Sequence, residues 1–243
     1  DIMTFGMGES SVDQLLHETM SHMENPSLAT YAKPCEVRLR ATAKAAGAEE
    51  AEAMLAPVVA EVRAALGDYV YGVDVKGLEA VCFQLLKERN LTLSTAESCT
   101  GGRVAERITA LPGVSSVYRG GVVSYWTSVK AAVLGVPQET LDQYGAVSEE
   151  TARAMAEGAR RVLGCDIALS STGVAGPDKD DRGNEVGTMF VAIATPAGSY
   201  VRTLALGNRP VRERLRIQTA SHAFDLAQRY LSGLPYSDSK KER

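Results

Sequence analysis

Residues 91–108 hold the feature that most constrains the fold, a strand pattern that runs through a glycine-containing turn directly into a helix pattern. Apolar and polar residues alternate over residues 91–95, which predicts a half-buried strand. Residues 96–102 form the turn, and residues 103–108 begin an amphipathic helix. Main-chain N–H groups point outward at such a turn, and the helix dipole favours negative charge there. The turn can therefore serve as an oxyanion hole or as a phosphate cradle.

Length and composition indicate an ordinary globular protein with one large or two modest domains. The chain has 243 residues, of which 45% are hydrophobic and 23% charged, so it can bury a core without covalent staples. A net charge of −4 and the lack of a basic block argue against a nucleic-acid partner, and no apolar run is long enough for a membrane span. The four cysteines lack CxxC spacing, which indicates free thiols in a reducing cytosol and predicts a cytoplasmic protein.

A change of pattern predicts two domains, residues 1–73 and residues 74–243. The first is expected to be a small α+β domain. Alternation predicts a half-buried strand over residues 36–42, and a helix is expected over residues 48–66, followed by a short strand at residues 69–71.

The second domain alternates helices with strands. We expect strands over residues 91–95, 121–125 and 167–171, and a hairpin formed by residues 187–195 and 200–206. Helices are expected over residues 128–134 and 148–163, and a last helix carries an apolar stripe of Ile217, Ala220, Phe224, Ala227 and Leu231. This order predicts an α/β fold with a mixed sheet between helix layers.

The scarcity of histidine limits the chemistry. The chain has only three histidines, His17, His22 and His222, which argues against a Ser-His-Asp catalytic triad. The sequence contains neither the paired-His nor the CxxC spacing that is typical of zinc sites. We therefore expect neither a metal nor a cofactor. If Ser98 is a nucleophile, Lys130 is the best candidate for its base, because the field of a helix N-terminus and partial burial would both lower its pKa. The alternatives are that Ser98 only caps the helix and that Lys130 is a solvated surface lysine.

Five other residues could complete a site. Tyr125 at the end of a predicted strand could relay or position a proton, or could be a core aromatic residue. Gly173 and Gly176 would let a ligand approach the backbone closely, although an ordinary loop after a strand would also explain them. Arg212, like Arg209, begins the last helix and could pair with a phosphate or could simply be solvated.

Four ordered motifs make residues 74–233 resemble the C-terminal domain of the competence- and damage-inducible CinA proteins, the nicotinamide-nucleotide amidohydrolase family. The motifs are Ala96-Glu97-Ser98-Cys99-Thr100-Gly101-Gly102, Tyr125 with Lys130-Ala131-Ala132-Val133-Leu134-Gly135-Val136, Thr172-Gly173-Val174-Ala175-Gly176-Pro177, and Val186-Gly187-Thr188. The N-terminal part resembles the KH-like middle domain of the same proteins, through residues 25–33 and 67–72. The domain that usually precedes it is missing, so we expect a C-terminal piece of a longer protein.

The resemblance implies a serine amidohydrolase that converts nicotinamide mononucleotide to nicotinic acid mononucleotide and ammonia in NAD salvage, as a homodimer. The family's catalytic serine, tyrosine and lysine fall on Ser98, Tyr125 and Lys130. Its arginine falls on Arg209 or Arg212, and the match does not decide between them. The residues expected to bind the substrate are Thr100, Gly101, Gly102, Thr172, Gly173, Gly176, Arg209 and Arg212.

The chain departs from the family pattern in two places. The loop after Pro177, often glycine-rich in the family, contains several charged residues over 178–185, and Trp126 and Thr127 replace smaller polar residues. No GxxG motif in a basic setting occurs in the first domain, so RNA binding is not carried over. Two other functions stay open: a non-catalytic nucleotide-binding or competence-related scaffold, and an amidase of another small amide.

Overall fold

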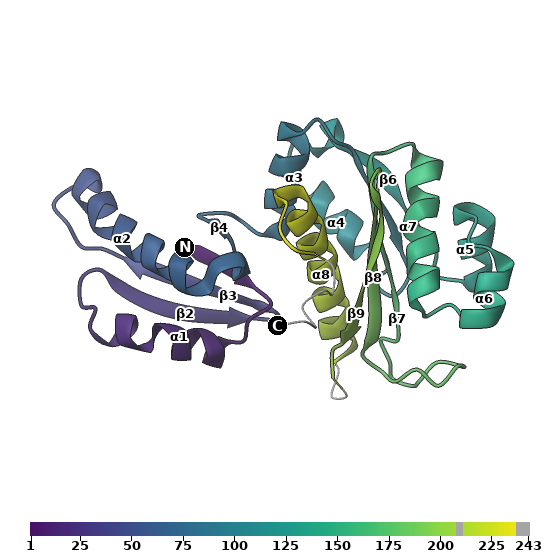
Figure 1. Ribbon diagram of the computed structural model, residues 1–243, viewed down its shortest axis with the longest axis horizontal. Coiled ribbons are helices and arrows are strands. Elements are labelled where there is room, and N and C mark those ends of the chain that lie inside the picture. Colours follow the sequence, from purple (N-terminus) through teal and green to yellow (C-terminus); the bar gives the residue numbers. More distant parts are fainter. Residues whose placement is uncertain (208–210, 237–243) are drawn as a thin grey trace. The chain divides into compact units, whose positions relative to one another are not determined.

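The chain forms two compact units, the first covering Asp1–Gly77 and the second beginning at Leu78. The structure is a computed structural model that describes residues 1–207 and 211–236 (Figure 1). The expected domain boundary after residue 73 lies a few residues before this division. Among the described helices, none combines the length and the apolar character that a bilayer crossing requires.

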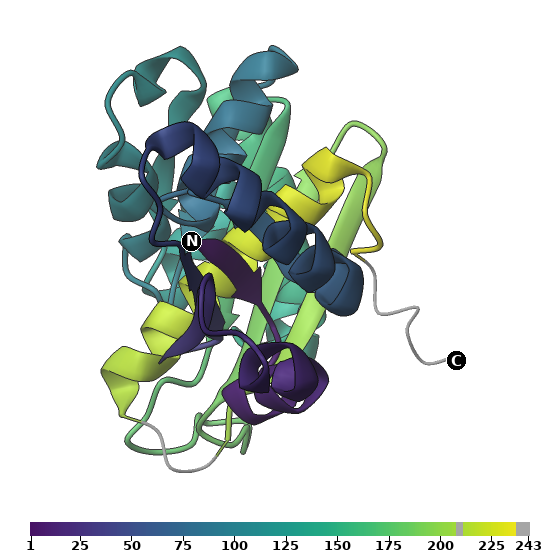
Figure 2. The same cartoon turned by 90° about the vertical axis from the view of Figure 1, so that its left-hand side faces the viewer.

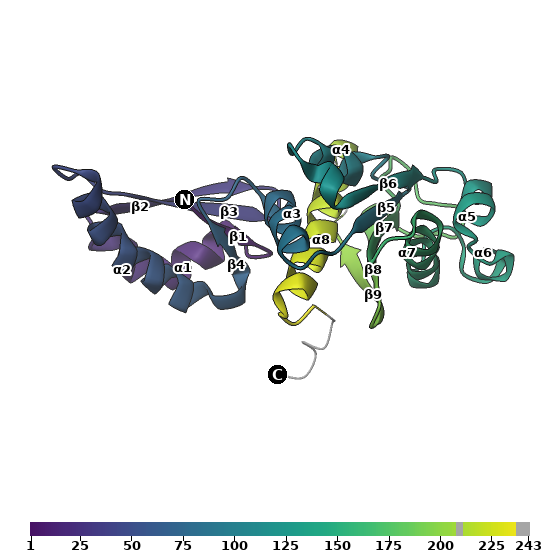
Figure 3. The same cartoon turned by 90° about the horizontal axis from the view of Figure 1, so that it is seen from above.

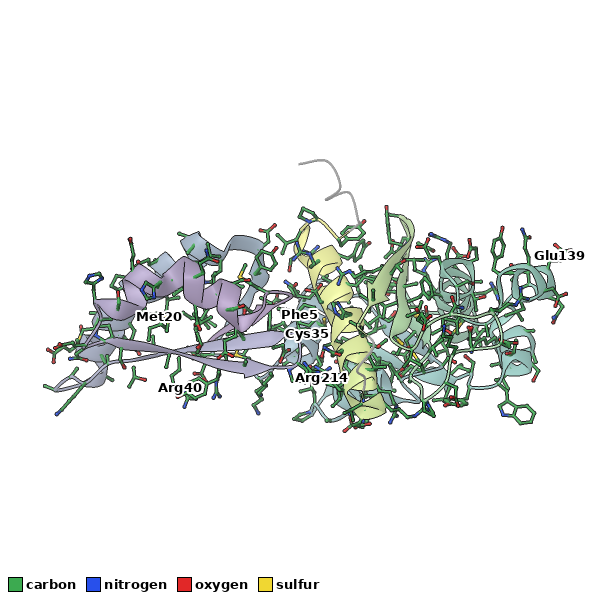
Figure 4. All side chains as sticks on the ribbon, turned by 90° about the horizontal axis from the view of Figure 1, so that it is seen from below. Phe5, Met20, Cys35, Arg40, Glu139 and Arg214 are labelled. Atoms are coloured by element: carbon green, nitrogen blue, oxygen red, sulfur yellow. The ribbon has the colours of Figure 1, made fainter. Side chains whose placement is uncertain are left out.

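The first unit is a four-stranded antiparallel sheet with two helices on one face. In chain order its elements are β1 (Ile2–Phe5), α1 (Glu9–Ser21), β2 (Ser27–Lys33), β3 (Glu36–Thr42), α2 (Ala48–Leu66), the 3-10 turn η1 (Gly67–Tyr69) and β4 (Val70–Val73). The strand order β2-β3-β1-β4 gives a split βαβ arrangement. Figure 2 and Figure 3 show both helices on the same side of the sheet, and in Figure 4 Met20 of α1 and Arg40 of β3 lie on opposite faces.

One apolar cluster holds this unit together. Val58, Val62 and Leu66 recur at four-residue intervals on α2 and pack in a cluster that also contains Ile2 of β1 and Leu39 of β3. The helix expected over residues 48–66 and the strand expected over residues 36–42 are both present. Strand β1 was not expected, because all four of its residues are buried and it therefore shows no alternation of apolar and polar residues.

The second unit is built on a five-stranded mixed sheet. Its strands are β5 (Leu93–Glu97), β6 (Tyr118–Val123), β7 (Ile167–Gly173), β8 (Thr188–Thr195) and β9 (Gly198–Ala205), in the order β6-β5-β7-β8-β9. Strands β6, β5 and β7 are parallel, whereas β8 and β9 form the expected antiparallel hairpin. Its helical segments are α3 (Leu78–Glu88), α4 (Arg103–Thr109), the 3-10 turn η2 (Val114–Ser116), α5 (Thr127–Leu134), α6 (Gln138–Tyr144), α7 (Glu149–Leu163) and α8 (Arg212–Ser232).

Helices cover both faces of this sheet. Helices α3, α4 and α8 lie on one face, and α7 lies on the other with α5 and α6 packed against it (Figure 1). Small residues of α7, Ala152 and Ala156, pack against Phe190 and Ala192 of β8. Ser148 caps α7 by accepting the main-chain N–H of Thr151 at 3.1 Å. The expected mixed sheet between helix layers is therefore confirmed.

The end of β6 differs from the sequence prediction in a way that matters for the site. The strand was expected to continue to Tyr125, but it ends at Val123. The reason is that β6 pairs with β5 only as far as Glu97, opposite Val123. The main-chain N–H of Ser124 then donates to the carbonyl of Glu97 at 2.8 Å, and Tyr125 lies in the following loop.

The order of the parallel strands creates a crevice at one edge of the sheet. From β5 the chain crosses to β6 on one side, and it later returns to β7 on the other side of β5. Such a reversal separates the loops that follow the two neighbouring strands, here β5 and β7, at their carboxyl ends. Ligands of open α/β sheets bind at this kind of switch point.

Glu97, at the end of β5, fixes the turn between strand and helix. Its side chain is 1% exposed. The carboxylate accepts the Thr100 hydroxyl at 2.7 Å and the main-chain N–H groups of Gly102, Val104 and Ala105 at 2.8–3.0 Å. These N–H groups belong to the start of α4, where a helix has no intrahelical acceptors for them. Glu97 therefore caps α4 from inside the molecule.

We expect Glu97→Ala to destabilise the second unit strongly, because it leaves buried donors at the start of α4 without an acceptor. The expected loss in the free energy of unfolding is about 3 kcal/mol. The measurement is urea unfolding followed by circular dichroism. The matched control is Glu106→Ala, which removes an exposed carboxylate from the first turn of the same helix and should cost no more than about 0.5 kcal/mol. Equal losses for the two variants would contradict the capping role.

Candidate active site

The carboxyl ends of the three parallel strands bring the predicted catalytic residues Ser98 and Tyr125 and the predicted substrate-binding residue Thr172 to one edge of the sheet. Ser98 follows β5, Tyr125 follows β6, and Thr172 lies near the end of β7. A cavity of about 250 Å³ opens at this edge. Its lining residues are Ser98, Cys99, Tyr125, Lys130, Ala146, Val147, Thr172, Gly173, Val174, Ala175, Gly176, Asp178, Asp180 and Arg212.

Lys130 and Ser98 are in direct contact. Lys130 lies in the first turn of α5, as the sequence predicted, and its Nζ is 2.8 Å from Ser98 Oγ. The same Nζ donates to the main-chain carbonyl of Ser124 at 2.6 Å. The side chain of Lys130 is only 1% exposed, and in residues 1–207 and 211–236 it has no ion pair with a carboxylate. The lysine is therefore held in the interior by neutral oxygen atoms.

Burial lowers the pKa of Lys130 to about 8, because the ammonium form loses its solvation. At pH 7 about one lysine in ten is then neutral, compared with fewer than about one in a thousand for an ordinary lysine. One N–H of the neutral amine can donate to Ser124, and the lone pair can accept the Ser98 hydroxyl proton. The geometry and the pKa together fit a general base.

Cys99, the neighbour of Ser98, has the opposite character. Its thiol is buried, and burial raises its pKa to about 12. The thiolate is the reactive form of cysteine, so this thiol is a poor nucleophile at neutral pH. The local chemistry therefore favours Ser98 over Cys99.

The turn after Ser98 offers fewer free N–H groups than the sequence suggested. The N–H of Gly101 donates to the carbonyl of Ser98 at 3.0 Å, and the N–H of Gly102 donates to Glu97. Within the described part of the chain, the N–H groups of Cys99 and Thr100 donate to no protein oxygen. Of these two residues only Cys99 lines the cavity, so the expected oxyanion hole over residues 99–102 is narrowed to the Cys99 N–H.

Thr100 faces the interior instead of the cavity. It is fully buried, and its hydroxyl bonds to the Glu97 carboxylate and, at 2.6 Å, to the Ser171 hydroxyl. Neither Thr100 nor Gly101 nor Gly102 lines the cavity. The structure thus gives these three predicted substrate-binding residues a place in the framework of the turn, because Glu97 draws the turn inward.

Arg212 connects two walls of the cavity. Its guanidinium donates to the Tyr125 hydroxyl at 2.7 Å and to the Gly176 carbonyl at 2.6 Å. Tyr125 is 55% exposed, and in the described residues its hydroxyl has no hydrogen bond to Ser98 or Lys130. Since Lys130 contacts Ser98 directly, a relay through Tyr125 is not needed. Arg209, the alternative to Arg212, lies outside the described residues.

The β7 loop forms the remaining wall. Thr172 donates its hydroxyl to the Ala146 carbonyl at 2.7 Å and so ties β7 to the loop before α7. A Cβ on Gly173 would lie 2.1 Å from Met189 Sδ and 2.8 Å from the Thr188 carbonyl oxygen, so no side chain fits there. Gly176 has φ +82°, a conformation that favours glycine.

The charged loop over residues 178–185 is folded by one of its own carboxylates. Asp180 accepts the main-chain N–H groups of Arg182 at 3.1 Å and Asn184 at 2.7 Å, and also the Asn184 side-chain amide at 2.7 Å. Asp178 and Asp180 line the cavity. The departure from the glycine-rich family pattern therefore brings two carboxylates to the site. The described residues contain no cluster of three His, Cys, Asp or Glu side chains suited to a metal ion.

Sequence reasoning missed two residues that shape the nucleophile turn, Glu97 and Arg216. Arg216 of α8 donates to the main-chain carbonyls of Cys99 at 3.3 Å and Thr100 at 2.8 Å. An acidic residue at the end of a strand, just before a helix start, could have indicated the role of Glu97. Nothing in the local pattern points to Arg216, because its contact joins residues more than a hundred positions apart.

Both units of the chain match known protein families. Residues 75–231 match the family described as CinA C-terminal domain, and residues 1–72 match the family described as damage-inducible protein CinA KH domain. A CinA-like protein of Desulfovibrio desulfuricans is 44% identical over 96% of this chain, and one of Kosmotoga olearia is 43% identical over 95%. The chain spans about half the length of these relatives, 55% in each case.

Solved structures agree with this assignment. A CinA superfamily protein from Klebsiella pneumoniae is similar with a TM-score of 0.62 and 30% identity, over 64% of this chain and 96% of that one. A competence/damage inducible protein from Agrobacterium tumefaciens gives a TM-score of 0.60 and 32% identity, over 66% of this chain and 99% of that one. The chain therefore belongs to the CinA family, with both the KH and the C-terminal domain of that family present.

Proposed function

We propose that the chain hydrolyses the carboxamide of nicotinamide mononucleotide to nicotinic acid mononucleotide and ammonia, with Ser98 as nucleophile and Lys130 as general base. The observation that carries this proposal is the buried Lys130 amine, 2.8 Å from Ser98 Oγ and without a carboxylate partner among the described residues. A lysine in this setting has the lowered pKa that a serine nucleophile needs from its base.

The proposed reaction has two halves. The Ser98 hydroxyl proton moves to the neutral Lys130 amine as Oγ attacks the carboxamide carbon. The Lys130 ammonium then returns the proton to the leaving nitrogen, which departs as ammonia and leaves an acyl group on Ser98. A water molecule, deprotonated by Lys130, attacks this acyl group, and the proton that Lys130 gained returns to Ser98 as the acid leaves.

The negative charge of the tetrahedral intermediate needs donors near Ser98. The N–H group of Cys99 is the candidate, because Cys99 lines the cavity, Thr100 does not, and the N–H groups of Gly101 and Gly102 are already used inside the turn. A donor of this kind accelerates acyl transfer by about 10²–10³-fold in serine hydrolases.

The charges around the cavity support a nucleotide with a cationic ring. Arg212 can supply a guanidinium for the phosphate, which it favours through paired N–H donors. Asp178 lines the same cavity and would face a pyridinium ring favourably. The choice of the mononucleotide itself is supported by the resemblance of the four motifs to the nicotinamide-nucleotide amidohydrolases.

A non-catalytic scaffold is a weaker explanation of this site. Burying an amine without a charged partner costs free energy, and a protein that only held phosphate would gain more from an exposed lysine. An amidase that acts on another small amide stays the second candidate, because the Ser98–Lys130 contact would serve it equally well.

One assay separates the three functions. We expect steady ammonia release from nicotinamide mononucleotide, and much slower release from nicotinamide and from glutamine. Ser98→Ala should abolish turnover, and Cys99→Ala should keep most of it, because the Cys99 thiol is protonated.

Faster release from another amide would replace the substrate, and absence of release from every amide would favour the scaffold. Loss of turnover in Cys99→Ala with survival in Ser98→Ala would reverse the choice of nucleophile.

The rate should depend on pH through the neutral fraction of Lys130. Since burial lowers the pKa of Lys130 to about 8, the neutral amine becomes populated as pH rises through this value. We expect kcat/KM to rise along an acid limb centred near pH 8 and to level off above it.

Lys130→Arg is the matched variant, because it keeps a positive charge and removes the usable base. It should lower kcat by about 10²-fold or more and abolish the limb. Near-normal turnover in Lys130→Arg would mean that the residue supplies only charge, and the Ser-Lys mechanism would have to be abandoned.

A further inference from the structure

We propose that Arg216 is a positioning residue that holds the peptide groups after Cys99 and Thr100, and so fixes the turn that presents Ser98 and the Cys99 N–H to the reacting carbonyl. This inference rests on the proposed function, because it concerns the turn that carries the nucleophile of the same site. Arg216 lies in the second turn of α8 and is partly buried, with 27% of its side chain exposed.

The guanidinium of Arg216 contacts two successive peptide groups of the nucleophile turn. Its Nε donates to the Cys99 carbonyl at 3.3 Å, and one of its terminal nitrogens donates to the Thr100 carbonyl at 2.8 Å. A planar guanidinium with donors in fixed directions can orient two carbonyls at once, which a lysine ammonium cannot do in the same way. The contact therefore constrains the direction of both peptide planes.

The direction of each carbonyl determines the direction of the next N–H. In a planar trans peptide, the carbonyl of Cys99 and the N–H of Thr100 point to opposite sides. Cys99 lines the cavity, whereas Arg216, which holds the Cys99 carbonyl, does not. The Thr100 N–H is thereby directed away from the guanidinium, and the peptide group that follows the cavity-lining Cys99 is held in one orientation.

Two further contacts keep Arg216 in place. Its remaining terminal nitrogen donates to the Glu213 carboxylate at 3.0 Å, and the other oxygen of Glu213 accepts a hydrogen bond from Arg103 at the start of α4. Gly101 leaves room for the guanidinium: a Cβ there would lie 3.2 Å from an Arg216 nitrogen, and its φ of +61° favours glycine. The turn, α4 and α8 therefore form one connected assembly behind the nucleophile.

The test compares Arg216→Met with Arg214→Met on the full chain. Arg214 lies on the same helix, is exposed and makes none of the hydrogen bonds to the nucleophile turn (Figure 4). For Arg216→Met we expect kcat to fall by about 10-fold or more, with KM within about 2-fold. The acid limb should stay near pH 8, because the burial of Lys130 is unchanged. Arg214→Met should keep kcat within about 2-fold.

Unchanged kcat in Arg216→Met, a loss confined to KM, or an equal loss in Arg214→Met would overturn the inference. If Arg216→Met melts at a clearly lower temperature, Glu213→Ala decides instead, because it keeps the guanidinium and removes one of its supports. A smaller fall in kcat at unchanged KM supports the positioning role, and unchanged kcat contradicts it.

A second readout does not depend on the choice of substrate. A fluorophosphonate forms a bond between phosphorus and Ser98 Oγ, fluoride leaves, and the hydroxyl proton passes to Lys130, while a phosphoryl oxygen occupies the oxyanion position. Intact-mass spectrometry measures the rate of this labelling in each variant.

Slower labelling in Arg216→Met, but not in Arg214→Met, supports the inference even if nicotinamide mononucleotide proves not to be the substrate. Equal labelling rates in the wild type and Arg216→Met would overturn the inference. A wild-type chain that is not labelled at Ser98 would contradict the inference together with the proposed nucleophile.

Discussion

Lys130 Nζ is enclosed between the Ser98 hydroxyl and the Ser124 carbonyl, without a carboxylate partner among the residues that the structure describes. Most buried lysines are paired, because an isolated ammonium loses its solvation. Here the cost appears as the lowered pKa of the amine. That shift turns a residue that is ordinarily a cation at neutral pH into a base within reach of a hydroxyl. The positions of the sheet edge, the turn and helix α5 all matter because they create this one contact.

A buried carboxylate and a partly buried guanidinium support the same turn. The buried Glu97 carboxylate accepts hydrogen bonds from main-chain N–H groups at the start of α4. The guanidinium of Arg216, which lies on α8, donates hydrogen bonds to carbonyl groups of the same turn. Glu97 binds the Gly102 N–H and the Thr100 hydroxyl, and Arg216 binds the carbonyls of Cys99 and Thr100. The N–H of Cys99, which lines the cavity and has no protein acceptor among the described residues, is left for a ligand. Because only this N–H is left for a ligand, the turn is suited to hold one oxyanion, although its sequence resembles a phosphate cradle.

The residues that the sequence could identify are those whose signal is local. Ser98 at a strand-to-helix turn and Lys130 in the first turn of a helix follow from patterns a few residues long, and the structure brings the two together. The mixed sheet also followed from the order of patterns. The end of β6 and the inward direction of the Thr100 side chain could not be predicted from the sequence, because both depend on the position of Glu97 in the folded sheet. The role of Arg216 could not be predicted either, because its partners are distant in sequence. They are also main-chain atoms, which every residue type has, so no residue pattern indicates them.

The most direct test of this account is the pKa of the Lys130 amine itself. Lysine labelled with ¹³C at Cε reports the charge of each amine by NMR, and Lys130→Arg identifies the signal of residue 130. The account predicts a titration near pH 8, because burial lowers this pKa to about 8. It also predicts nearly the same value in Ser98→Ala, since desolvation and not the hydroxyl is the main cause. A titration near the ordinary lysine value of about 10.4 would contradict the account, because the amine would then be almost wholly protonated when Ser98 must lose its proton.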